Sequence, residues 1–157
     1  MSRNSGDNMQ TLFACLITLQ FVLVVFHDWV DIPGWTHGSQ VQTIVGRRKL
    51  WLATLINAIF PGFAAGFVIY FWNRPTPHFV TRYCVIYCAV TLGSAIAMWY
   101  IPYFFGAKEE TKRDHAKMYA GTLQVLPARG DNPCPNLLHV CFHILFAVTF
   151  VLGLTLR

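Results

Sequence analysis

Two histidines four residues apart open the last apolar stretch of this chain. They are His139 and His143, in the segment PNLLHVCFH at residues 135–143. Residues at positions i and i+4 share one face of a helix, so a helix here would carry both imidazoles side by side. Imidazole exchanges protons near neutral pH and is a common metal ligand. The spacing therefore predicts an acid–base site or a metal site.

A metal or haem site is one interpretation of these histidines. His27, Asp28 and Cys134 are the further nitrogen, oxygen and sulfur ligands that such a site would use. The pair alone is a weak signal, because Val140 rather than the glutamate of a zinc-protease motif follows His139. The three histidine boxes of a membrane di-iron oxygenase are also missing from the sequence. The cofactor therefore stays unknown, with a metal ion and a haem as candidates.

Two other interpretations of the histidines stay open beside the metal. In the first, each ring hydrogen-bonds a neighbouring helix and ties the helices together, as polar side chains commonly do in membranes. In the second, a neutral histidine carries a proton for a quinone, a lipid head group or a transported ion. These alternatives leave open whether the protein is an enzyme.

The helices that must position these residues stand out as four long stretches with almost no charge. They are residues 9–26, 51–72, 79–105 and 136–156, and Arg82 is the one formal charge inside them. Each can cross a bilayer core of about 30 Å at about 1.5 Å per helical residue. Hydrophobic residues are 55% of the chain and charged residues only 12%. The sequence predicts an all-α polytopic integral membrane protein, a four-transmembrane-helix bundle forming a single domain over residues 1–157.

The first stretch resembles a signal peptide only in part, and we expect it to be retained as a helix. Its flank, residues 2–10, carries Arg3 offset by Asp7, and no small-x-small cleavage site follows the apolar run. The lipid bilayer is therefore the expected surrounding of all four helices.

Lysine and arginine residues predict the orientation. Eight of the 12 lie in the loops at residues 27–50 and 106–135. Such residues collect on the cytoplasmic side, so we expect both loops in the cytoplasm and both termini outside the cell membrane. The same rule explains the net charge of +5 without a nucleic-acid partner, and no nucleic-acid motif is present. Arg47, Arg48 and Lys49 could also attract an anionic head group.

Depth along the helices brings polar groups together in the cytoplasmic leaflet. The two histidines lie roughly 5 and 10 Å into the last stretch, and Asn57 lies roughly 9 Å into the second. We expect one pocket lined by His27, Asn57, Tyr100, Tyr103, His139 and His143. The leading hypothesis is that this pocket binds, and could transform, a small ligand or metal. His139 and His143 would serve as ligands or as catalytic acid–base groups.

Small residues recur at every fourth position in the two middle stretches. They are Ala58, Gly62 and Gly66 in the second stretch, and Ala89, Gly93 and Ala97 in the third. Such stripes let helix backbones approach closely in lipid. The turn at residues 73–78 joins these two stretches into a helical hairpin. The two stripes either pack against each other within this hairpin, or face a second copy of the chain or another membrane protein. The second alternative predicts a non-catalytic accessory or assembly subunit of a larger membrane complex.

Overall fold

The computed structural model describes residues 5–156, with side chains from residue 8 onward. Its elements in chain order are α1 (Ser5–Phe26), β1 (Asp31–Ile32), β2 (Thr36–His37), α2 (Gly38–Val45), α3 (Arg47–Tyr70), α4 (His78–Ala95), the π-helical turn η1 (Ile96–Tyr100), α5 (Ile101–Phe105), α6 (Glu109–Met118) and α7 (Leu137–Thr155).

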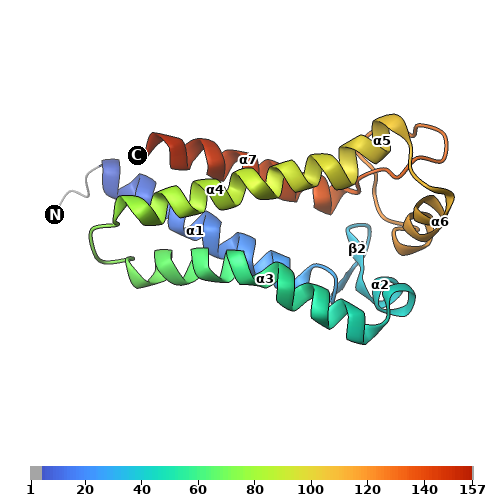
Figure 1. The fold of residues 1–157 in the computed structure, drawn as a ribbon, viewed down its shortest axis with the longest axis horizontal. Coiled ribbons are helices and arrows are strands. Elements are labelled where there is room, and N and C mark those ends of the chain that lie inside the picture. The colour runs from blue at the N-terminus through green and yellow to red at the C-terminus, as the bar shows by residue number, and fades with distance from the viewer. Residues whose placement is uncertain (1–4, 157) are drawn as a thin grey trace.

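Four helical segments are long and apolar enough to cross a membrane. They are Asn8–Phe26, Arg47–Tyr70, His78–Phe105 and Leu137–Thr155. The segments run side by side along the long axis of the molecule (Figure 1). The start of α1, the end of α7 and the turn at residues 71–77 lie at one end, here called the terminal end. The segments at residues 27–46 and 106–136 form the opposite end, here called the loop end.

The mostly helical chain with four such helices confirms the coarse prediction of the fold class, with two local differences. A two-residue antiparallel hairpin pairs β1 with β2 in the first loop. The second long helix begins at Arg47, four residues before the predicted start. Gly46 has φ +87°, which interrupts the helical conformation between α2 and α3. The three basic residues that follow form the first turn of α3.

A π-helical turn interrupts the third long helix near its loop end. Pro102 lacks the N–H that would bond to the carbonyl of Met98, and its ring crowds that carbonyl. The turn before it, Ile96–Tyr100, widens to the π pattern. The helix therefore continues to Phe105 with a local change in the direction of its side chains.

The four long helices pack mainly as two pairs. α1 packs most extensively against α3, and α4 against α7, whereas α3 and α4 meet over a shorter length. The buried core takes side chains from all four, including Ile17, Ala64, Cys88 and Phe146. A buried hydrogen bond of 2.7 Å from Gln20 Nε2 to the Thr149 hydroxyl joins α1 to α7 within this core.

The two stripes of small residues do not meet, so the first of the two alternatives for them is wrong. A Cβ atom at Gly62 would touch Phe21 of α1 rather than α4. Ala89, Gly93 and Ala97 are exposed. No described atom from another element lies within 4 Å of a Cβ placed at Gly93. The stripe on α4 and η1 therefore faces outward.

Candidate functional site

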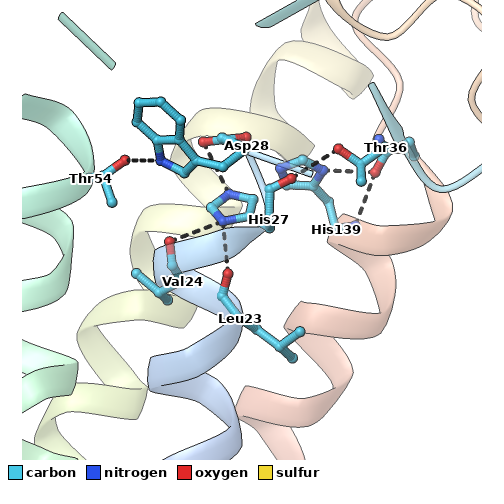
Figure 2. Close-up of polar contacts among 9 residues, drawn as sticks. Leu23, Val24, His27, Asp28, Thr36, Thr54 and His139 are labelled. Atoms are coloured by element: carbon cyan, nitrogen blue, oxygen red, sulfur yellow. Dashed lines mark hydrogen bonds and ion pairs between the residues drawn. The ribbon is translucent and has the colours of Figure 1, made fainter. Parts of the chain in front are cut away.

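His27 and Asp28 form a pair at the C-terminus of α1. The Nδ1 atom of His27 lies 3.1 Å from the carbonyl oxygens of both Leu23 and Val24, to which it donates. The Nε2 atom lies 3.3 Å from Asp28 Oδ2. Figure 2 shows the ring lying between the two carbonyl oxygens and the Asp28 carboxyl group. The side chains are 18% and 26% exposed, so the pair is reachable from the surface.

The first loop fixes the position of this pair. The Thr36 hydroxyl donates to the His27 carbonyl at 3.0 Å, and Trp29 Nε1–H donates to the Thr54 hydroxyl at 2.9 Å (Figure 2). Gly38 lies against the backbone of Trp29, where a Cβ atom would be only 2.7 Å from the carbonyl carbon. This close approach requires glycine and folds the loop back over the end of α1.

His139 lies behind the pair and is only 8% exposed. Asn136 caps α7, because its Oδ1 accepts the His139 backbone N–H at 3.0 Å. The same oxygen accepts Nδ1–H of the His139 ring at 2.7 Å, which fixes the tautomer and the orientation of the ring. Asn136 Nδ2 donates to the Trp35 carbonyl at 3.2 Å, so the first loop and α7 are held together.

Aromatic rings connect the histidines at the loop end. The His139 ring lies edge-on to the His27 ring at 5.8 Å, and 3.9 Å from the Trp99 ring, between centroids. Tyr119 contacts His139 at 5.5 Å and His115 at 4.8 Å. We call His27, Asp28, Trp99, His115, Tyr119 and His139 the histidine cluster.

Burial shifts the pKa values of two residues of the histidine cluster, His115 on α6 and Tyr119 just after it. Burial lowers the pKa of His115, and the backbone of Cys134 partly opposes this shift. Burial raises the pKa of the Tyr119 hydroxyl, and the negative charge of Asp28 raises it further. The neutral form of His115 is therefore favoured, and Tyr119 keeps its proton. The Asp28 carboxylate is the charged group that acts on Tyr119.

The structure brings together only some of the residues that the sequence placed in one site. His27, Asp28 and His139 lie together. His143 lies one turn further along α7, where its Nδ1 atom is 3.1 Å from the Tyr100 hydroxyl. These two residues extend the histidine cluster toward the middle of the molecule.

The side chains of three other expected residues have different surroundings, although the backbone of Cys134 bonds to His115. Asn57 is exposed on the outer side of α3. The buried Tyr103 donates its hydroxyl to the Pro127 carbonyl at 2.8 Å, and Cys134 Sγ lies 3.7 Å from the Leu126 carbonyl. The Tyr103 contact holds the segment at residues 106–136 against α5, whereas the Cys134 contact lies within that segment.

The metal ligands suggested by the sequence lie only partly together: His27, Asp28 and His139 are close, but they do not surround a common point. Within residues 8–156 no group of three or more His, Cys, Asp or Glu side chains has the arrangement to hold a metal ion. His139 Nδ1 is engaged by Asn136, and Cys134 points into its own loop. The geometry of the described residues therefore gives the metal set no support, and the metal site stays a prediction from the sequence.

Sequence reasoning missed Trp99, His115 and Tyr119 as members of the site. Tryptophans commonly lie at the membrane interface, so the position of Trp99 near the end of a long apolar stretch did not indicate a site. His115 and Tyr119 are four residues apart, so they share a helix face, and this spacing could have suggested them. Their contact with His139 is a tertiary contact that the spacing alone does not provide.

Comparisons with known proteins give no family for this chain. A scan against protein-family models finds no match, and searches of the curated proteins and of the solved structures find no similar protein.

Proposed function

We propose that the chain is a multi-pass protein of the cell membrane whose four long helices form a transmembrane bundle. Its loops at residues 27–50 and 106–135 would face the cytoplasm. The apolar helices and the excess of lysine and arginine at the loop end support this placement. A reporter active only in the cytoplasm is expected to work when inserted at residues 108–114 and to fail after residue 157. The reverse pattern would contradict the orientation.

At the loop end, the protein would bind a small polar ligand and exchange a proton with it through Asp28 and His27. The 3.3 Å contact between these partly exposed side chains is the observation that carries the proposal. Asp28 would accept a hydrogen bond or proton from the ligand. The Nδ1–H of His27 is held by the last carbonyls of α1, so its Nε2 atom faces Asp28 and would stabilise the carboxylate when it carries the proton exchanged with the ligand.

The rest of the histidine cluster would serve this pair by position. The ring of His139 contacts that of His27 and is fixed by Asn136, so it supports the ring that faces Asp28. Trp99 and Tyr119 pack around His139 and limit the access of water to it. Side chains that are themselves fixed in this way hold an acid–base pair in one geometry.

The test is the small-molecule content of the protein purified in nanodiscs made from its own membranes. Wild type is compared with Asp28→Asn and with the control Asp31→Asn, and extracts are analysed by mass spectrometry. Asp31 lies in the same loop, but its carboxylate accepts from the Ser39 N–H and hydroxyl. We expect a molecule present in wild type and in Asp31→Asn, and lost from Asp28→Asn. Equal contents in all three samples, or none in wild type, would overturn the proposal.

A second candidate function is that of an accessory subunit of a membrane complex. The outward-facing stripe of Ala89, Gly93 and Ala97 favours it, because a neighbouring helix could approach its backbone closely. The occupant would be a transmembrane helix of another protein or of a second copy.

The matched test places the same side chain inside and outside the stripe. Ala97 and Ala53 are both exposed, on η1 and α3 respectively. After mild-detergent purification, Ala97→Leu is expected to lose a stoichiometric partner that wild type and Ala53→Leu retain. Equal retention by both variants would contradict this role for the stripe.

A further inference from the structure

A cavity of about 600 Å³ opens at the terminal end, opposite the histidine cluster. Its lining residues come from the ends of α1, α3 and α4, from Leu156 after α7 and from the turn that joins α3 to α4. These ends of the helices lie at the left of Figure 1. Its volume is within the range of sites for small ligands, about 300 to 1,000 Å³. Nothing in the function proposed for the loop end uses it.

The lining of this cavity is amphipathic. Phe13 and Val68 are 3% and 4% exposed, so they form part of an apolar floor. Asn73, Arg74 and His78 line the cavity and are exposed, so they form part of a polar rim. A ligand that fits both would have a polar head at the rim and an apolar part below it.

The charge at the rim is positive. Arg74 lies in the turn after α3, with its guanidinium 4.5 Å from the centre of the Tyr70 ring. None of the ion pairs among the described side chains involves Arg74, and the lining contains no acidic residue. The acidic side chains described by the structure lie in the segments at residues 27–45 and 106–136, at the loop end. Among the side chains that the structure describes, Arg74 therefore has no carboxylate partner at the terminal end.

The start of α4 adds to this positive potential. Pro77 precedes the helix and gives no side-chain cap, while His78 and Thr81 of its first turn line the cavity. Free N–H groups at the start of a helix favour an anion. Arg74 is the main attraction, and the helix end strengthens it.

We propose that this cavity binds an oxyanion head group, phosphate or carboxylate, carried on an apolar chain. Arg74 would hold the oxyanion through its planar set of N–H donors. The apolar chain would lie on the floor formed in part by Phe13 and Val68. A lipid from the bilayer would supply this chemistry if the chain spans the membrane as proposed above, and a soluble phosphate compound would supply only the head.

The test measures binding by native mass spectrometry in detergent micelles, using two probes. The first probe is short-chain phosphatidylglycerol, with short-chain phosphatidylcholine as its zwitterionic counterpart, and the second is glycerol 3-phosphate. Arg74→Gln removes the charge at the rim. Arg82→Gln is the control, because Arg82 is exposed near the same end of α4 but does not line the cavity. Arg74→Lys tests whether a charge without the planar donors is enough.

We expect wild type and Arg82→Gln to retain phosphatidylglycerol in preference to phosphatidylcholine. Arg74→Gln should bind it about tenfold or more weakly, the loss expected for one charge-assisted hydrogen bond, with Arg74→Lys between the two. Binding of glycerol 3-phosphate that depends on Arg74 would also support the oxyanion site and would identify a soluble source. Equal binding by Arg74→Gln and Arg82→Gln, or no preference of wild type for an anionic probe, would overturn the proposal. Neither result would affect the test of Asp28.

Discussion

Gly153 lies where α7 touches both α4 and α1, and replacing it with alanine should separate these helices. A Cβ atom at this position would lie 2.6 Å from Val85 Cγ2 and 3.0 Å from Phe13 Cε2. Ordinary contacts between carbon atoms are about 3.5 to 4.0 Å. The helices would therefore have to move apart by about 1 Å, or both neighbours would have to leave their rotamers.

The expected cost is the difference between two opposing effects. Overpacking a well-packed core typically costs about 1 to 3 kcal/mol. Alanine is better than glycine within a helix by about 0.5 to 1 kcal/mol. The difference is about 0 to 2.5 kcal/mol. Because the closest neighbour, Val85, is β-branched and stiff at χ1, we expect Gly153→Ala to lower the free energy of unfolding by about 1 to 2 kcal/mol. For a chain of this size, that change lowers the Tm by about 2 to 8 °C.

Gly66→Ala is the matched control. Gly66 is also in a long helix, but no described atom of another element lies within 4 Å of a Cβ placed there. Only the gain in helix propensity remains, so the Tm should be unchanged or slightly higher.

Buried thiols provide the assay for both variants. Cys84 and Cys88 are buried, whereas Cys15 and Cys141 are exposed and would first be replaced by serine. Labelling of the buried thiols by a thiol-reactive fluorophore during heating then reports unfolding in detergent. If Gly153→Ala raised the Tm as much as Gly66→Ala, the close packing of α7 on α4 and α1 would be refuted.

The same assay checks three further predictions. Thr149→Val leaves Gln20 Nε2 with only the Leu145 carbonyl at 3.5 Å, and should lower the free energy of unfolding by about 1 kcal/mol. The control Thr91→Val loses only a bond within its own helix and should lower it less. Equal losses for the two variants would contradict the bond between α1 and α7. Asn136→Ala removes the cap of α7 and should lower the free energy of unfolding by about 1 to 2 kcal/mol. Asn136→Ser should lose less, because its hydroxyl can still accept the backbone N–H. An unchanged Tm of Asn136→Ala would argue against the cap. The lowered pKa of His115 means that the unfolded chain takes up its proton more readily than the folded one, so this residue destabilises the fold as the pH falls through and below its usual value of about 6.5. The Tm of His115→Gln should therefore fall less than that of wild type between pH 7.5 and 5.5, and identical falls would exclude a contribution from His115.

Long helices were predictable here because their signal is local. A run of some 20 residues without charge predicts a spanning helix whatever its neighbours are. The hairpin turn at residues 73–78 was predictable for the same reason, since Pro75 and Pro77 cannot continue a helix. The early start of α3 was missed because the basic residues at positions 47–49 were assigned to the loop by their charge, although they can form a helical turn and still reach water.

For the candidate site, the sequence predicted how far along each helix the residues lie, but not which side of the helix they occupy. Position along the sequence placed His27, His139 and Asn57 near one end of the helices, and His27 and His139 do meet there. Asn57 lies at the expected position along α3 but on its exposed side. A helix that is apolar on nearly all sides has no amphipathic face to show which side is buried.

By itself, the sequence determined how many long apolar helices the chain has, nearly where each begins and ends, and which polar groups lie near their ends. These properties depend on residues adjacent along the chain. Only the tertiary structure decided that α1 pairs with α3 and α4 with α7, that the stripe containing Gly93 faces outward, and that Tyr119 joins the histidines. Those outcomes depend on how side chains of different helices fit together, and an apolar surface of nearly uniform hydrophobicity does not encode that fit in its pattern.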